Sequence, residues 1–368
     1  MAAPALERAA GERWVWVWPT GAHLALVAAA IAATLGLVGS FSLQGWHQAL
    51  SGWDSHWYLL LGRQGYPSHL APQWAYFPLY PGLIMALVHL GVPALGAALL
   101  ISLLSTAALA FCLVRLTEVE LGARAGAWLP WMLLLSPFGF FFAAAYSEAL
   151  FFALAAASLL CARRGRFTWA GALGGLAAAT RITGVLLLVP LLLEALQQRG
   201  WDPRRLSWAQ AGIALVPLGL LGFAVFARLR AQSWLAFTHA ESAFFGLRAA
   251  WPWNGFQLTW SAALGGSPQS GAFQVELVAG LLGIPVLALA IWRLRPLYWS
   301  FMVLSWLGAV SLVFWRSVPR YELAFFPILL LVLSATERAR WLRWVLLVAG
   351  GATMAYGASV FARGLWLD

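Results

Sequence analysis

The sequence predicts an all-α protein, a polytopic bundle of transmembrane helices, and three observations lead to this fold class. First, 62% of the 368 residues are hydrophobic and only 10% are charged. A soluble domain is about 45–50% apolar and about a quarter charged, so these values exclude a soluble enzyme. Second, 23 Trp and 22 Phe are too much aromatic surface for a disordered chain. Third, long apolar runs alternate with short arginine clusters.

About eleven apolar runs are long enough to be spans, at about 17–25 residues for one crossing. We expect them at residues 21–39, 94–114, 123–141, 145–161, 167–180, 182–195, 208–227, 273–292, 297–315, 321–336 and 343–361. The first run is too long for a signal peptide, so we interpret it as a retained span. Segment 80–92 is interpreted as a re-entrant or surface-lying helix, because a crossing there would move later arginine clusters to the other side. A bundle of twelve spans is the alternative.

The orientation follows from the basic residues, all of which are arginine, and the net charge is +10. Arginines between consecutive spans mark cytoplasmic loops. These clusters are Arg115/Arg124, Arg163/Arg164/Arg166, Arg199/Arg204/Arg205, Arg293/Arg295 and Arg338/Arg340/Arg343. Because the positive charge follows the membrane topology, we expect the lipid bilayer as a partner and no nucleic acid.

Two outward-facing loops, 40–93 and 228–272, are much longer than the usual connection of about 4–6 residues. Both are rich in Trp, Tyr, Phe and His, which favours short helices at the membrane interface. We therefore expect a single domain over 1–368, with a catalytic first loop and a second loop that contributes a donor or acceptor pocket. The two cysteines, Cys112 and Cys161, lie in apolar runs and are interpreted as packing residues.

Two isolated acids lie at the outer ends of predicted spans. Asp54 is the only acid between Glu12 and Glu118. Glu148 lies where an acid beside hydrocarbon is costly, which indicates function. A carboxylate whose desolvation and hydrogen bonds are set by the fold can act as a tuned base. The alternative is that Asp54 caps a short helix and Glu148 stabilises a helix start.

Arg181 and Arg320 lie in outer turns, against the charge bias that sets the orientation. Such arginines indicate an anionic ligand, because guanidinium matches phosphate with a bidentate fork. We expect both, together with neighbouring Tyr321, to bind a substrate phosphate. The alternative is that they reach ordinary lipid headgroups.

Polar and aromatic residues of the outer loops are candidates for a sugar or acceptor pocket. Their side chains can stack on sugar rings and hydrogen-bond hydroxyls, or they can anchor the loops at the membrane surface. The candidates are Trp53, His56, Tyr58, Tyr66, Tyr146, His239 and Glu241. The histidines lack metal-ligand spacing, and neither a Gly-rich phosphate loop nor a Rossmann fingerprint is present.

Several short motifs follow one another between Trp53 and Gly184 and return near residue 320. They are Trp53-Asp54-Ser55 with Tyr58, Gly65-Tyr66, Phe77-Pro78-Leu79-Tyr80-Pro81, Ser136-Pro137, Ala145-Tyr146-Ser147-Glu148-Ala149-Leu150-Phe151, Ala179-Thr180-Arg181-Ile182-Thr183-Gly184 and Pro319-Arg320-Tyr321. In this order they resemble the mannosyltransferase family that adds the second mannose of GPI anchors (PIG-V) and its prokaryotic relatives. Gly52 stands where eukaryotic members have a basic residue, a departure that bears on acceptor contacts.

The resemblance implies a GT-C glycosyltransferase, a polytopic protein with an outer or lumenal active site and a polyprenyl-phosphate sugar donor. It implies a prokaryotic plasma membrane, with the site facing outward. Asp54 then corresponds to the catalytic acid of the first loop and Glu148 to the acid of the second, while Arg181 and Arg320 are similar to positions near the donor phosphate. No cofactor is implied, although some oligosaccharide-transferring relatives hold a divalent metal between two acids.

The residue types fit transfer of a sugar from a lipid phosphate. One carboxylate takes the proton of the acceptor hydroxyl, and cations stabilise the departing phosphate. A single displacement of this kind inverts the anomeric centre, so a β-linked mannose donor gives an α-mannoside. We predict mannose, although glucose and arabinose donors demand similar groups, and the acceptor is a glycolipid, a glycan or a protein.

A function of another class explains some of these features. A proton-coupled transporter or flippase of a lipid-linked or anionic solute would use Asp54 and Glu148 as proton relays. It leaves the two long aromatic loops without a role. An acyl- or phospho-transferase acting on lipids is a third class, but the sequence presents no clear nucleophile for it.

Overall fold

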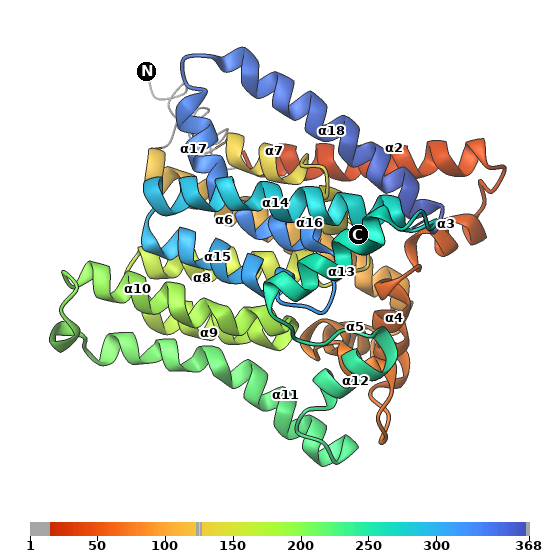
Figure 1. Ribbon diagram of the computed structural model, residues 1–368, viewed down its shortest axis with the longest axis horizontal. Coiled ribbons are helices and arrows are strands. Elements are labelled where there is room, and N and C mark those ends of the chain that lie inside the picture. Colours follow the sequence, from red (N-terminus) through yellow and green to blue (C-terminus); the bar gives the residue numbers. More distant parts are fainter. Residues whose placement is uncertain (1–14, 123–124, 126, 366–368) are drawn as a thin grey trace.

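The computed structural model describes residues 15–122, 125 and 127–365, and within these ranges the chain folds into helices alone (Figure 1). An isolated bridge between Ala249 and Leu312 is the β-type pairing found there. The all-α prediction is confirmed. The charged start of the chain and Arg124, from one predicted cytoplasmic cluster, lie outside the described residues.

Most of the described chain is α-helical. The α-helices are α2 (Val17–Leu37), α3 (Leu43–Leu50), α4 (Asp54–Gln64), α5 (Leu79–His89), α6 (Ala94–Leu121), α7 (Trp128–Leu134), α8 (Glu148–Arg163), α9 (Phe167–Thr180), α10 (Leu188–Gln198), α11 (Val216–Ala231), α12 (Ala236–Phe245), α13 (Pro252–Leu264), α14 (Ser270–Arg293), α15 (Pro296–Val310), α16 (Val318–Tyr321), α17 (Ile328–Ala335) and α18 (Arg340–Ala362). The short 3₁₀ helices are η1 (Pro72–Ala75), η3 (Gly139–Phe142), η4 (Ile182–Leu187), η5 (Pro203–Arg205), η6 (Trp208–Leu215) and η7 (Glu322–Phe325).

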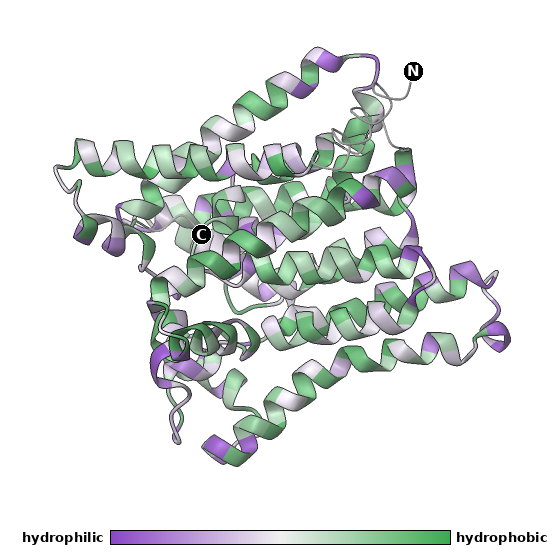
Figure 2. Ribbon diagram, turned by 180° about the vertical axis from the view of Figure 1, so that it is seen from behind, coloured by the Kyte–Doolittle hydropathy of each residue, from purple (hydrophilic) through white to green (hydrophobic). Residues whose placement is uncertain are grey.

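The long helices lie side by side, and the short helices α3, α4, α5, α12 and α13 gather at one end of the bundle (Figure 1). We call this the Asp54 end, and the opposite end, which carries Glu194 on α10, the Glu194 end. The long helices are hydrophobic over most of their length, while hydrophilic residues concentrate near the ends (Figure 2). This distribution is what a bilayer requires of a polytopic protein.

Five helices are long and apolar enough to cross a membrane: α2, α6, η6 with α11, α14 and α18. A sixth span results if the bent pair Val318–Phe325 and Ile328–Ala335 counts as one, and the two halves meet at 61°. The polytopic membrane class is thus confirmed, whereas the number of eleven spans stays a prediction. α5, in the segment interpreted as re-entrant or surface-lying, has 11 residues and a length of about 16 Å, too short to cross alone.

Two predicted spans are interrupted, which corrects their expected boundaries. The segment 123–141 contains α7, only 7 residues long, followed by a turn and η3. Ser136 precedes Pro137, and a residue before proline avoids the helical conformation. The segment 321–336 is broken just before α17, where Pro327 supplies no backbone N–H to continue the preceding helix. The sequence periodicity does not reveal these breaks because both halves are apolar.

Close packing of glycines joins α9 to η6 and α11. A Cβ atom on Gly171 would lie 1.8 Å from the carbonyl oxygen of Gly212, and one on Gly219 would lie 2.0 Å from that of Gly175. Small residues of this kind let helix backbones approach closely in a membrane. The interface places the end of α9, and with it Arg181, beside α11, whose far end leads into α12 at the Asp54 end.

Candidate active site

Asp54 begins α4 and follows a residue in an uncommon conformation. Trp53 has φ 53° and ψ −131°, a backbone conformation that residues other than glycine rarely adopt. The backbone N–H of Asp54 donates a hydrogen bond to Tyr146 Oη at 3.3 Å. Strained backbone persists only where the surrounding structure holds it, and it concentrates at functional sites. Tertiary contacts therefore fix the position of Asp54.

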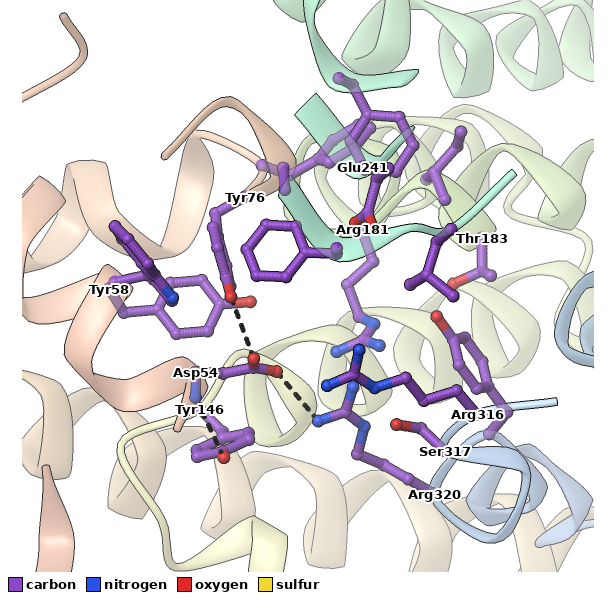
Figure 3. A pocket seen from close by; sticks show the side chains of 18 of the residues that line it. Asp54, Tyr58, Tyr76, Tyr146, Arg181, Thr183, Glu241, Arg316, Ser317 and Arg320 are labelled. Carbon is purple, nitrogen blue, oxygen red and sulfur yellow. Dashed lines mark hydrogen bonds and ion pairs between the residues drawn. The ribbon is translucent and has the colours of Figure 1, made fainter. Parts of the chain in front are cut away.

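Both carboxylate oxygens of Asp54 have partners from distant parts of the chain. Tyr76 donates its hydroxyl to Oδ1 at 3.0 Å, and Arg320 donates Nη1 to Oδ2 at 3.0 Å (Figure 3). Burial and, to a smaller extent, the nearby Asp54 raise the pKa of Tyr76 above its usual range. The tyrosine hydroxyl therefore stays protonated and donates to the carboxylate.

Arg320 connects Asp54 to a second, deeper acid. Its Nε lies 3.3 Å from Glu148 Oε1, and Arg181 donates Nη1 to the same oxygen. Glu148 begins α8 and its side chain is 2% exposed, compared with 30% for Asp54. We call the chain of ion pairs Asp54, Arg320, Glu148 and Arg181 the Asp54 network. Within this network Glu148 is the buried acid and Asp54 is the acid that solvent can reach.

Aromatic rings hold both arginines of the Asp54 network in place. The guanidinium of Arg320 lies 5.5 Å from the centre of the Phe141 ring and 5.8 Å from that of Tyr146. The guanidinium of Arg181 lies 5.4 Å from the centre of the Tyr321 ring. Such cation–π contacts stabilise a guanidinium where water is scarce. Tyr321 thus contacts Arg181 directly.

The Asp54 network borders a cavity of about 210 Å³ at the Asp54 end. Three arginines line it, and Figure 3 shows Arg316 beside Arg181 and Arg320. Arginine keeps its charge at every relevant pH, so three positive charges face the two carboxylates of the Asp54 network. The balance of these five groups is positive, which suits an anionic ligand such as phosphate.

Glu241 faces the same cavity from α12, a helix of the second long loop. Burial, together with the negative charge of Asp54, raises the pKa of the Glu241 carboxyl to about 7. The group is therefore neutral in mildly acidic solution and ionised in mildly alkaline solution. The cavity consequently has a net charge that decreases as the pH rises through neutrality.

Most of the predicted site residues come together at this cavity. The lining includes Trp53, Asp54, Tyr58, Tyr146, Arg181, Glu241, Arg320 and Tyr321. Glu148 lies behind the lining and borders a small adjoining void together with Arg181 and Arg320. Tyr58 is oriented by a hydrogen bond of 2.8 Å between its hydroxyl and Ser147 Oγ. Residues separated by up to 266 positions in the sequence therefore meet at this cavity.

Three predicted pocket residues lie elsewhere in the described structure. His56 is exposed and packs edge-on against Trp57. Tyr66 is tilted against Trp74 and donates its hydroxyl to the carbonyl oxygen of Tyr76, so it supports the loop from behind. His239 is exposed on α12, with Nδ1 3.2 Å from Ser233 Oγ. Helical geometry explains why His239 does not line the cavity. It stands two residues before Glu241 on α12, so the two side chains point to different faces of the helix.

Two further residues of the cavity are not singled out by the sequence. Arg316 lies in the same turn as Arg320, apart from the predicted cytoplasmic arginine clusters, so its position is a signal for it too. Tyr76 is one of many aromatic residues in the first loop, and only the fold brings its hydroxyl to Asp54. Among the residues that the structure describes, no three His, Cys, Asp or Glu side chains converge as a metal-binding group.

The fold is similar to that of a solved membrane protein. It superposes with a TM-score of 0.56 on the crystal structure of ArnT from Cupriavidus metallidurans bound to undecaprenyl phosphate, at 16% sequence identity. The match covers 89% of this chain and 64% of the other, so the chain spans less than two thirds of the length of ArnT. No curated protein matches the chain in a sequence comparison.

The chain is thus a helical membrane bundle of this fold, with acids and arginines around a cavity at one end. A match over residues 15–199, about half of the chain, identifies the family. The protein belongs to the Mannosyltransferase (PIG-V) family. The resemblance that the motifs indicate is thereby confirmed, and the matched region contains Asp54, Glu148 and Arg181.

Proposed function

We propose that the protein transfers a mannose from a polyprenyl-phosphate donor to an acceptor hydroxyl, with inversion and with Asp54 as the general base. The observation that carries this proposal is the contact of Arg320 with both Asp54 and Glu148 at the edge of an arginine-lined cavity. In this proposal Asp54 is the base and the nearby arginines bind the donor phosphate. The undecaprenyl phosphate bound to the structurally similar ArnT supports a lipid-phosphate donor.

The donor phosphate binds between the three arginines in this proposal. Arg320 has one acid on either side, and a phosphate that recruits its guanidinium draws it away from Asp54. Oδ2 of Asp54 then becomes available to an acceptor hydroxyl, while Tyr76 still holds Oδ1. Glu148 stays paired with Arg181 and keeps the arginines from leaving the site.

The transfer then proceeds as a single displacement. The acceptor oxygen forms a bond to the anomeric carbon as its proton passes to Asp54 Oδ2. The bond between the anomeric carbon and the phosphate oxygen breaks, and its electron pair stays on the polyprenyl phosphate. The arginines stabilise the negative charge that develops there. A donor with a β-linked mannose gives an α-mannoside, since attack comes from the opposite face.

We also propose that the Asp54 end faces outward from a prokaryotic plasma membrane. The connections α8–α9, α10–α11, α14–α15 and α17–α18, which carry arginine clusters, lie together at the Glu194 end (Figure 1). Loops with such clusters are retained on the cytoplasmic side. The acceptor in this proposal is a glycolipid, a glycan or a protein that presents a hydroxyl at the outer surface, and no metal or other cofactor takes part.

The test is sugar transfer by the purified protein in liposomes. The donor is radiolabelled polyprenyl-phosphate mannose, the acceptor is a membrane glycolipid extract, and wild type is compared with Asp54→Asn. Labelled product from wild type alone supports the proposed reaction. Glucose and arabinose donors in parallel test the choice of sugar.

Two results would contradict the proposal. Full transfer by Asp54→Asn would remove this residue from the role of base. Binding of the donor without transfer to any extract, combined with proton-coupled movement of the lipid across the liposome bilayer, would favour a transporter.

A further inference from the structure

The segment that carries Arg316 and Arg320 contains a residue in an unfavourable backbone conformation. Ser317 has φ 61° and ψ 23°, in the left-handed region that is unfavourable for residues other than glycine. The helix that follows, α16, is only 4 residues long. Arg316 precedes Ser317 directly and Arg320 lies one helical turn after it. The backbone at Ser317 therefore sets the relative direction of both guanidinium groups.

A buried carboxylate on α14 holds this backbone. The N–H of Ser317 donates to Glu276 Oε1 and the N–H of Val318 donates to Glu276 Oε2, both at 2.7 Å. Glu276 is 1% exposed in a helix apolar enough to span the membrane. A carboxylate in such a helix is costly unless it is paired or hydrogen-bonded. Here each carboxylate oxygen accepts a charge-assisted hydrogen bond from one of two consecutive backbone N–H groups. Among side chains of this shape, only a carboxylate has two oxygen atoms that can both accept.

Neighbouring contacts bring α14 close enough for this clamp. The backbone N–H of Trp315 donates to Thr259 Oγ1 of α13 at 2.7 Å. The indole ring of Trp315 lies against Gly280, where an added Cβ would be 2.5 Å from the ring. Gly280 stands one helical turn after Glu276 on α14. Between residues 315 and 318, the segment is thus anchored by the backbone N–H groups of Trp315, Ser317 and Val318.

We infer that Glu276 is a positioning residue for the donor phosphate, an inference that rests on the proposed function. It holds Ser317 in its left-handed conformation and so directs Arg316 and Arg320 into the cavity. Glu276 does not line the cavity, and it acts through the two arginines. The conformation relaxes when one of its two acceptor oxygens is lost, and the arginines then bind the phosphate less well.

The experiment compares Glu276→Gln with three other variants. The glutamine side chain has nearly the same shape, but its NH₂ group cannot accept a backbone hydrogen bond. We expect the KM for polyprenyl-phosphate mannose to rise about tenfold, with less than about twofold change in the acceptor KM and in kcat. Glu276→Asp keeps two acceptor oxygens at a shorter reach, so its donor KM should fall between those of wild type and Glu276→Gln.

The matched control is Glu194→Gln. It replaces a buried helical carboxylate like that of Glu276, but at the opposite end of the bundle. Assayed below its melting temperature, it should keep the donor KM of wild type. Binding of undecaprenyl phosphate to each variant in nanodiscs gives a second readout that needs no turnover. It should weaken about tenfold for Glu276→Gln and not for Glu194→Gln.

The outcomes separate this inference from the proposed function. A wild-type donor KM for Glu276→Gln, together with a raised one for Arg320→Ala, overturns the role of Glu276 and leaves the proposed function intact. An equal rise in donor and acceptor KM with a lower melting temperature means general packing and also overturns it. A wild-type donor KM for Arg320→Ala would contradict the donor site itself. Should Glu276→Gln not fold, a wild-type donor KM for Glu276→Asp overturns the inference.

Discussion

Two buried ion networks lie at opposite ends of the bundle and are built from the same residue types. At the Asp54 end, Arg320 bridges Asp54 and Glu148, and Arg181 completes the chain. The Glu194 end has its own network, formed by Glu120, Arg163, Glu194, Tyr298 and Arg295. Arg163 there contacts Glu120 at 2.5 Å and Glu194 at 2.9 Å.

The difference lies in what surrounds each network. At the Glu194 end the charged residues belong to α6, α8 and α10 and to the start of α15, and they join these helices side by side. At the Asp54 end the charged residues stand at helix starts and turns beside a cavity, and Asp54 is 30% exposed. Buried ion pairs alone therefore do not indicate catalysis. Access to a cavity distinguishes the proposed reactive site from the network that joins helices.

The largest expected effect is that of Asp54→Asn. The amide cannot take a proton from the acceptor hydroxyl, so transfer should fall by about 10²–10⁴-fold. The melting temperature should change little, because the site is partly open to solvent. Initial rates with radiolabelled donor and a thermal unfolding curve of the same preparation measure both quantities. If transfer fell only in proportion to the amount of folded protein, Asp54 would have a structural role like that of Glu194, and the proposed difference between the two networks would be wrong.

Glu194→Gln should show the opposite behaviour. Glu194 accepts from Arg163 and from Gln198, and its side chain is fully buried. Removing its charge leaves Arg163 with one acidic partner fewer in a dry environment and should cost about 3 kcal/mol of stability. The melting temperature therefore drops, while transfer per folded molecule at low temperature stays at the wild-type level. A specific fall in kcat would mean that the two ends are coupled.

Arg320→Ala should affect the donor and spare the acceptor. A charge-assisted contact to phosphate contributes about 1.5–3 kcal/mol, so the donor KM should rise by roughly ten- to a hundredfold. The acceptor KM should stay within about twofold. Steady-state kinetics with each substrate varied in turn separate the two. An unchanged donor KM would return Arg320 to the role of a lipid-headgroup anchor.

The smallest expected effect concerns the pH dependence of donor binding. The pKa of Glu241 is raised to about 7, so the carboxyl is neutral below this pH and negative above it. The added negative charge opposes the phosphate, and the donor KM should rise roughly two- to fivefold between about pH 6 and pH 8. Glu241→Gln should give a flat profile over this interval. A step of equal size in the variant would assign the titration to another group.

The sequence predicts the four members of the Asp54 network because each stands out from its surroundings. Asp54 and Glu148 are isolated acids, and Arg181 and Arg320 contradict the charge bias of the loops. Their pairing is not predictable from the sequence, since Arg320 reaches Asp54 across 266 positions. The predicted loops 40–93 and 228–272 do carry short helices, as their aromatic composition indicates.

Other features depend on tertiary contacts that leave no local signal. Glu276 and Glu194 are both lone acids in apolar runs, and the sequence does not distinguish a backbone clamp from an ion pair. The break within 321–336 is hidden by apolar residues on both sides. His239 and Glu241 are two residues apart, but only the orientation of α12 decides which of them faces the cavity.

The cationic groups of the cavity are all guanidinium, and the whole chain contains no lysine. Amine-directed reagents therefore have no side-chain target anywhere in the protein, whereas arginine-directed dicarbonyl reagents can reach the mouth of the site. In the proposed reaction, a bound lipid phosphate would protect the three arginines of the cavity from such reagents, while exposed arginines elsewhere in the chain would still react. The absence of lysine also fixes the positive side of the cavity across the alkaline range, so any titration seen there reports on its acids and tyrosines.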